Sequence, residues 1–146
     1  MHDYMVTEII PVSKDKHEKE SKKVWKKHNE EIGEKFDKKS YYFEINADHK
    51  NAGYIQIDIG MGVAYLNDLI IKSEHRNNKL GHKAMEFFEI MARKHDCHKM
   101  RIKTCPERSP AAFHLYEKFG FIREATLKND YFNKKWVILS KFIGKK

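Results

Sequence analysis

The segment Glu74-His-Arg-Asn-Asn-Lys-Leu-Gly-His-Lys83 combines cationic side chains with residues that tolerate a left-handed backbone. The residues of these two kinds are Arg76, Asn77, Asn78, Lys79, Gly81 and Lys83. Such a loop can turn successive backbone N–H groups toward an anion, and the start of a helix adds the positive end of its dipole. The segment therefore predicts a phosphate-binding site, with an ordinary basic loop ahead of a helix as the alternative.

This segment lies between a predicted strand and a predicted helix, which would hold it in place. Residues 63–71 are the most apolar stretch, and their apolar side chains fall on both faces, as in a central strand covered on both sides. From Leu80, near the end of the segment, apolar residues recur at steps of three and four, which predicts an amphipathic helix to about His95.

The other elements are predicted from periodicity and from turn residues. The expected strands are residues 5–12, 41–45, 53–59, 100–105, 121–127 and 131–143, and the expected helical regions are 14–36, as one helix or two, and 109–119. Ser13 is an expected helix cap, and Gly33 and Gly120 are expected helix ends. This order predicts an α/β fold of the α+β type: a single mixed, mostly antiparallel sheet of six to seven strands with helices on both faces. One domain over residues 1–146 is expected.

The composition excludes several function classes. The chain has 146 residues, 40% of them hydrophobic, and a formal net charge of +8 at pH 7. Lysine greatly outnumbers arginine, the residue favoured for reading bases and phosphates, so a nucleic-acid partner is not expected. Cys97 and Cys105 are too few for a disulfide scaffold or a four-cysteine zinc site, and no histidine spacing indicates a metal. No signal peptide or membrane-spanning stretch is recognised, so a cytoplasmic protein without a membrane partner is expected.

Two stretches of the chain match the signatures of one enzyme family. Ala64-Tyr-Leu-Asn-Asp-Leu-Ile-Ile71 followed by Arg76-Asn-Asn-Lys-Leu-Gly81 resembles the acetyl-coenzyme-A signature of the GCN5-related N-acetyltransferases. Ser109-Pro-Ala-Ala-Phe-His-Leu-Tyr-Glu-Lys-Phe-Gly-Phe121 is similar to the family's other signature, in which a helix ends in Tyr-Glu-Lys-x-Gly-Phe. The two stretches lie in the expected order, separated by a helix and a strand.

The resemblance implies where acetyl-coenzyme A binds. Leu69, Ile70 and Ile71 would lie where the central strand separates from its neighbour, hydrogen-bond the pantetheine arm and stabilise the oxyanion through a backbone N–H. The residues implied to hold the pyrophosphate are Arg76, Asn77, Asn78, Lys79, Leu80, Gly81, His82 and Lys83. The residues implied to border the other side of the cofactor are Ser109, Ala112, Phe113 and Tyr116.

The resemblance also implies a direct transfer, in which a neutral amine attacks the thioester carbonyl within a ternary complex. Tyr116 matches the family's tyrosine that protonates the leaving thiolate. The amine must lose a proton first, because the pKa of a free alkylamine is about 10.4. The base is open among Asp68, Glu44 and Glu107, with Asp68 taken as the catalytic candidate.

Three positions depart from the family pattern. Lys79 stands where the family usually has glycine, so Asn78 is a candidate to adopt the backbone geometry that this glycine provides. Ser109 stands where asparagine is commoner, which leaves a hydroxyl for one of the amide's bonds. Asn67 stands where the polyamine-acetylating branch carries an acid, so the acceptor is not identified.

The predicted function is therefore N-acetyl transfer from acetyl-CoA to a primary amine of a small molecule or a protein, and a homodimer is one expected assembly. The alternative is a non-catalytic module on the same fold, which would bind coenzyme A, or nucleic acid through its basic surface. A steep loss of affinity with salt would be the mark of nucleic-acid binding.

Overall fold

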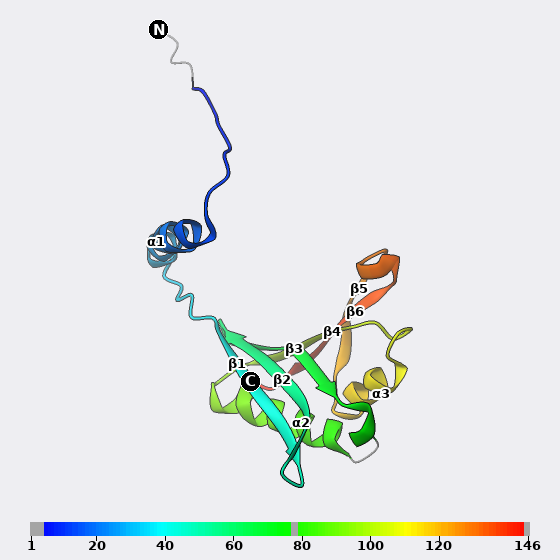
Figure 1. Ribbon diagram of the computed structural model, residues 1–146. Coiled ribbons are helices and arrows are strands. Elements are labelled where there is room, and N and C mark those ends of the chain that lie inside the picture. Colours follow the sequence, from blue (N-terminus) through cyan, green and yellow to red (C-terminus); the bar gives the residue numbers. More distant parts are fainter. Residues whose placement is uncertain (1–4, 77–78, 145–146) are drawn as a thin grey trace. The chain divides into compact units, whose positions relative to one another are not determined.

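The computed structural model describes residues 5–76 and 79–144 (Figure 1). Asn77 and Asn78 of the predicted phosphate loop lie outside the described residues. The chain divides into two compact units, residues 1–36 and residues 37–146. The expectation of one domain over residues 1–146 stays a prediction.

Over its described residues, 5–36, the first unit contains one helix, α1 (Lys14–Ile32). The Ser13 hydroxyl accepts a 3.2 Å hydrogen bond from the Lys16 backbone N–H, and Gly33 ends the helix with a left-handed φ of 74°, as predicted for both residues. The predicted strand over residues 5–12 is wrong, because these residues adopt no regular structure. A strand is stable only where a neighbouring strand takes its backbone hydrogen bonds, and an apolar pattern does not supply that neighbour.

The second unit is built on a six-stranded sheet whose order is β1-β2-β3-β4-β6-β5. Its strands are β1 (Lys39–Ala47), β2 (Lys50–Gly60), β3 (Val63–Ile71), β4 (Lys99–Thr104), β5 (Ile122–Leu127) and β6 (Trp136–Phe142). All neighbouring pairs are antiparallel except β3 and β4, which are parallel. The predicted mixed, mostly antiparallel sheet is confirmed.

The last strand begins later than predicted. Tyr131–Asn133 form a short 3₁₀ turn, η2, in which Phe132 has a φ of 59° and Asn133 a φ of 55°. The Trp136 indole N–H closes this turn with a 2.8 Å hydrogen bond to the Tyr131 carbonyl. The aromatic residues of this stretch thus pack within a turn, although their composition is typical of a strand.

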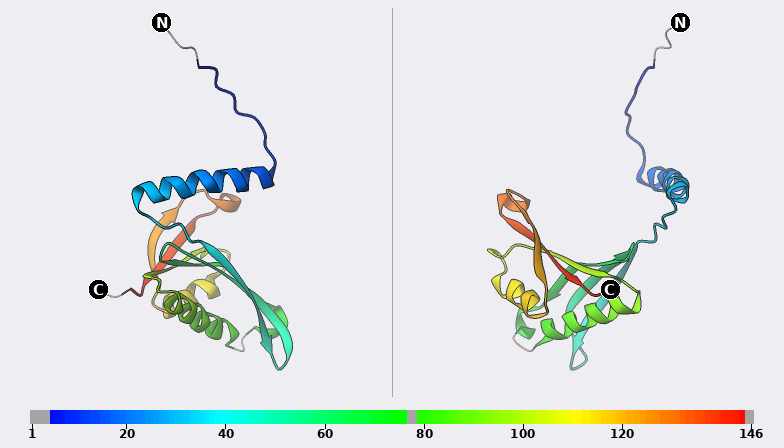
Figure 2. Two further views of the ribbon diagram at one scale, coloured as in Figure 1. Left: turned by 90° about the vertical axis from the view of Figure 1, so that its left-hand side faces the viewer. Right: turned by 180° about the vertical axis from the view of Figure 1, so that it is seen from behind.

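Two helices, α2 (Leu80–Lys94) and α3 (Pro110–Lys118), pack against one face of the sheet (Figure 2). α2 buries one stripe of side chains, namely Leu80, Ala84, Met85, Phe88, Met91 and Ala92. Phe88 is fully buried in one core with Ile57, Ile102 and Leu139 of the strands, and burying a side chain of this size stabilises the fold by about 1.5–3 kcal/mol. Among the described residues of the second unit, no α-helix lies on the opposite face. That a helix covers this opposite face therefore stays a prediction.

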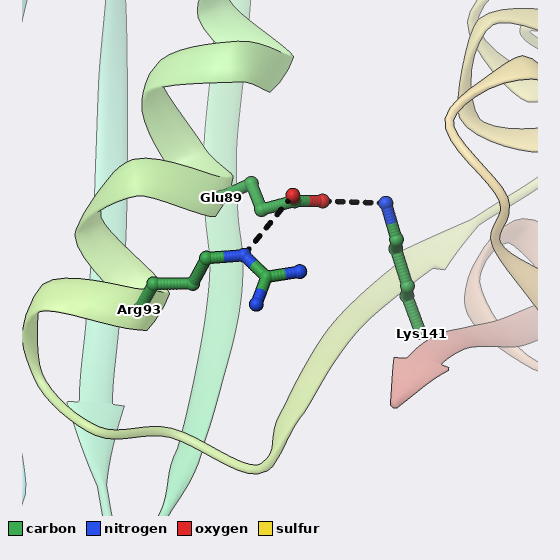
Figure 3. A network of polar contacts seen from close by, with 3 residues as sticks. All are labelled: Glu89, Arg93 and Lys141. Atoms are coloured by element: carbon green, nitrogen blue, oxygen red, sulfur yellow. Dashed lines mark hydrogen bonds and ion pairs between the residues drawn. The ribbon is translucent and has the colours of Figure 1, made fainter. Parts of the chain in front are cut away.

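An ion-pair network also ties α2 to the sheet (Figure 3). Glu89 of α2 receives hydrogen bonds from Lys141 of β6, at 2.5 Å, and from Arg93 one turn further along the helix, at 3.2 Å. Glu89 and Lys141 are both about a quarter exposed, whereas Arg93 is 55% exposed. The network holds the middle of α2 against β6 and leaves the N-terminus of the helix at the other end of the core.

Candidate active site

The site begins where β3 and β4 separate. Ile57 of β2 lies opposite Leu66, but the preceding residue, Gln56, lies opposite Asp68, so Asn67 is an extra residue in β3 and forms a β-bulge. The pairing of β3 with β4 ends at the same place, with Leu66 opposite Ile102. Beyond the bulge β3 is paired only with β2, and a gap opens between β3 and β4.

The backbone of β3 beyond the bulge presents polar groups to this gap. The Lys72 N–H donates a 2.7 Å hydrogen bond to Ala52 of β2, and the Ile70 carbonyl also faces β2, where a Cβ at Gly53 would lie 2.1 Å from it. Because successive residues of a strand turn their N–H and C=O groups to opposite edges, Leu69 and Ile71 direct theirs into the gap. The Ile71 carbonyl there accepts a 3.2 Å hydrogen bond from the Arg76 Nε.

A helix N-terminus with cationic side chains follows. The Lys83 N–H makes a 3.1 Å helical bond to the Lys79 carbonyl, whereas the N–H groups of Leu80, Gly81 and His82 precede the first such bond. Lys79 is the cap residue but gives no side-chain cap bond, and the first turn holds no acid. The N–H donors of this first turn, the helix dipole and the nearby Lys79 and Lys83 together suit a phosphate group.

Lys79 itself takes the left-handed backbone that the resemblance expects of a glycine, with φ 59° and ψ 19°. Left-handed geometry costs a residue with a side chain about 1–2 kcal/mol. The suggestion that Asn78 adopts this geometry falls outside the described residues. The second glycine, Gly81, is explained by packing instead of by backbone geometry. A Cβ there would lie 3.1 Å from Leu115 of α3, so glycine allows α2 and α3 to approach closely.

The helix α3 supplies the other predicted cofactor residues. Ser109 is exposed and accepts a 3.0 Å bond from the Phe113 N–H through its carbonyl, while its hydroxyl forms no cap bond. Ala112 and Phe113 are half-buried, and both pack against the same core as Leu69 of β3. Tyr116 is 8% exposed and packs edge-on against Phe121. Its burial raises the pKa of the phenol, which therefore stays protonated at neutral pH.

A comparison with family models identifies this arrangement. Residues 6–121 match the model of the Acetyltransferase (GNAT) family. The chain belongs to the GNAT acetyltransferase family. No curated protein matches it by sequence.

Solved structures share the GNAT fold of the chain at low sequence identity. A protein of Agrobacterium tumefaciens assigned as an acetyltransferase superposes with a TM-score of 0.74 and 23% identity, over 95% of this chain and all of the other. The ribosomal-protein-S18-alanine N-acetyltransferase of Escherichia coli gives 0.65 and 18%, over 83% of this chain and 77% of the other. A GNAT acetyltransferase of Elizabethkingia anophelis with acetyl-CoA bound gives 0.66 and 14%, over 71% and 76%.

The three acids considered as bases do not lie together in this GNAT chain. Asp68 is exposed in β3, immediately before Leu69, whose backbone faces the gap. Glu44 lies in β1 and lines a pocket of about 740 Å³ between β1 and α2. Glu107 follows β4 and pairs with Lys134 at 3.0 Å. Only Asp68 adjoins the bulge, and its role as the base stays a prediction.

One acid that the sequence did not single out is part of the site region. Asp58 of β2 is buried and accepts hydrogen bonds from Gln56, at 3.1 Å, and from Asn67 of the bulge, at 2.7 Å. Burial opposes ionisation of its carboxyl, but hydrogen bonds from Ser40, Asn67 and Gln56 and the charge of Lys38 outweigh this and lower its pKa. No sequence signal indicated the bulge that brings Asn67 to it.

Other kinds of site were also considered. Within residues 5–76 and 79–144, no group of histidine, cysteine, aspartate and glutamate side chains is arranged to hold a metal ion. Cys97 and Cys105 are both buried and free. No helix in this part of the chain is both long and apolar enough to span a membrane.

Proposed function

We propose that the protein transfers the acetyl group of acetyl-CoA to a primary amine of a small molecule or a protein, by direct attack in a ternary complex. The observation that carries this proposal is the gap between β3 and β4, which opens at a bulge and lies next to a basic helix N-terminus in a chain of the GNAT family.

Backbone groups would form most of the cofactor site. Leu69 and Ile71 offer N–H and C=O groups along the open edge of β3, where an extended pantetheine arm can pair as an additional strand. The N–H groups of Leu80, Gly81 and His82, together with the side chains of Arg76, Lys79 and Lys83, would hold the pyrophosphate. Ser109, Ala112 and Phe113 of α3 would border the cofactor from the other side. In support of this assignment, the similar GNAT protein of Elizabethkingia anophelis has acetyl-CoA bound.

The thioester supplies an activated acetyl group, and the residues of this chain would manage charge and protons around it. The Leu69 N–H would stabilise the oxyanion that develops on the carbonyl, because a donor fixed in a strand needs no reorganisation during the reaction. Tyr116 would give its proton to the departing thiolate, for which its raised pKa keeps it in the acid form. Asp68 would take a proton from the bound ammonium, directly or through water, and so leave the neutral amine that attacks.

The acceptor class follows from the same reasoning. Removal of a proton by Asp68 and donation of one by Tyr116 suit a primary amine that attacks in its neutral form. This amine can belong to a small molecule or to a protein. The similar Escherichia coli protein acts on an alanine of ribosomal protein S18, which shows that a protein amine can be served by this fold. A cytoplasmic location and a homodimer are further parts of this proposal.

Thermal unfolding with acetyl-CoA, coenzyme A and ATP at matched ionic strength tests the cofactor site. A ligand at 100 times its dissociation constant adds about 2.7 kcal/mol of stability, so both coenzyme A compounds should raise the midpoint by several degrees and ATP by much less. Release of free thiol is then measured with spermidine, tyramine, an aminoglycoside and a peptide with an N-terminal alanine. A thermal shift without thiol release for any amine would favour the non-catalytic coenzyme A module, and no shift with millimolar cofactor would exclude the proposed site.

A further inference from the structure

The buried carboxylate Asp58 lies on the side of the sheet that faces away from α2 and α3. Its neighbours in β2, Ile57 and Ile59, point into the core beneath α2, so the alternation of the strand turns Asp58 to the opposite face. Only 6% of Asp58 is exposed, and the side-chain amides of Gln56 and Asn67 both donate hydrogen bonds to it.

An ionised carboxylate accepts hydrogen bonds and cannot donate them, which fixes the orientation of both amides. Gln56 presents its Nε2 to Asp58 Oδ1, and Asn67 presents its Nδ2 to Asp58 Oδ2. The amide oxygens, Gln56 Oε1 and Asn67 Oδ1, are therefore the atoms that do not face the carboxylate. One buried charge thus orients two neutral hydrogen-bond acceptors.

These two amides lie level with the point where β3 and β4 separate, Asn67 in β3 itself and Gln56 in the neighbouring strand β2. Asn67 is the bulged residue of β3, and Gln56 lies opposite Asp68, the next residue after the bulge. The helices that border the proposed cofactor site, α2 and α3, lie on the other face of the sheet. An amine that approaches the thioester in the gap from the face without these helices would pass the two amides.

We propose that Asp58 is a positioning residue that holds the amide oxygens of Gln56 and Asn67 as a subsite for the acceptor amine. This inference rests on the proposed function and identifies the part of the same site that receives the nucleophile. A neutral primary amine has two N–H donors and one lone pair. Donation of its N–H groups to carbonyl oxygens leaves the lone pair free to attack, whereas a carboxylate in the same place would favour the unreactive ammonium form.

Side-chain amide NMR of the full chain, saturated with coenzyme A at pH 7.5, tests the subsite with 2,2,2-trifluoroethylamine as the probe, a primary amine that is neutral at this pH. In the wild type, the NH₂ signals of Asn67 and Gln56 should shift in a saturable manner as the probe is added. The Asn51 amide, whose Nδ2 donates to the Gly53 carbonyl in the same strand, is the internal reference and should not move. In Asp58→Asn the probe-dependent shifts should fall at least about fivefold, because the replacement amide no longer fixes the other two.

Glu124→Gln is the matched control, since Glu124 is another carboxylate that accepts side-chain hydrogen bonds, from Lys99 and Ser140, at the far edge of the sheet. It should leave the shifts of Asn67 and Gln56 unchanged. Equal shifts in the wild type and in Asp58→Asn would overturn the positioning role, and the absence of any shift in the wild type would overturn the subsite. The thermal shift with coenzyme A, recorded on each variant, shows whether the fold and the cofactor site are intact. The thiol-release assay reports separately on the proposed function.

Discussion

The Asn67 amide donates a 2.7 Å hydrogen bond to the buried carboxylate of Asp58, so the bulge in β3 is tied by a side chain to the strand beside it. A bulge leaves its extra residue outside the regular hydrogen-bond ladder. Here the side chain of that residue replaces part of the missing pairing. The same bond places a buried carboxylate beside the point where the gap between β3 and β4 opens.

Asp58→Asn should therefore lower stability in a pH-dependent way. The hydrogen bonds and the Lys38 charge lower the pKa of Asp58 in the folded chain from its ordinary value of 3.8, so this stabilisation is present above about pH 4 and is lost as the pH falls through the folded pKa. The loss at pH 7 should be about 1–3 kcal/mol, the usual cost of disturbing buried hydrogen bonds to a charge. Urea unfolding at pH 7, 5 and 3.5 checks this. A wild-type advantage that does not shrink toward pH 3.5 would contradict the assignment.

Lys79→Gly should stabilise the chain relative to Lys79→Ala. Both variants remove the charge, but only glycine removes the strain of the left-handed backbone at this position, where φ is 59°. Glycine removes about 1–2 kcal/mol of backbone strain, but its larger conformational entropy in the unfolded chain offsets part of this gain. The free energies of unfolding of the two variants should therefore differ by about 1 kcal/mol. Chemical denaturation of the two variants measures it, and an alanine variant as stable as the glycine variant would show that the backbone is not strained.

The same two variants test the phosphate contact of Lys79. If its ammonium meets the pyrophosphate, both should bind coenzyme A more weakly than the wild type, by a factor that shrinks as salt is raised. Calorimetric titration at low and at physiological ionic strength gives the two affinities. Unchanged affinity in both variants would leave the backbone N–H groups of α2 as the main phosphate ligands.

Tyr116→Phe should reduce turnover by about 10²–10⁴-fold, the usual contribution of a general acid, with little change in coenzyme A affinity. The raised pKa also predicts that the acid form persists on the alkaline side, so the tyrosine should cause no loss of turnover below about pH 10. Tyr65→Phe, which removes the hydroxyl of a half-buried tyrosine in β3, is the control. Thiol release with the best acceptor amine is the measurement. If the two phenylalanine variants turn over equally fast, Tyr116 serves only to pack.

The elements around the site were predictable because periodicity is local. The apolar run gave the observed bounds of β3, Val63–Ile71, and the spacing of three and four gave the start of α2 at Leu80. The Asp58 cluster was not predictable, because the bulge depends on the register between β2 and β3 and leaves no mark in either strand alone. The predicted strand over residues 5–12 was wrong for a related reason, since their apolar content is local but pairing with another strand is a property of the whole fold.

The final prediction concerns the Glu89 network, in which the two cations should contribute unequally. The pKa of Glu89 is lowered, and the hydrogen bond from Lys141 is the largest cause. Burial of the carboxyl raises this pKa, but the further hydrogen bond from Arg93 helps to outweigh the effect of burial. Lys141 and Glu89 are about equally shielded from water, but Arg93 is mostly exposed, and screening by solvent weakens an exposed pair. The coupling of Glu89 to Lys141 should therefore exceed its coupling to Arg93.

Double-mutant cycles in urea measure both couplings, with Glu89→Gln combined in turn with Lys141→Met and Arg93→Met, so that each cation is replaced by the same apolar side chain. We expect about 1–2 kcal/mol for Lys141 and at most about 0.5 kcal/mol for Arg93 at pH 7. Because the pKa of Glu89 is lowered in the folded chain, both couplings should be present above about pH 4.5, its ordinary value, and should be lost as the pH falls through the folded pKa. Equal couplings would mean that the bond between α2 and β6 is no stronger than a surface pair, and the position of α2 would then depend on the packing of its buried apolar side chains.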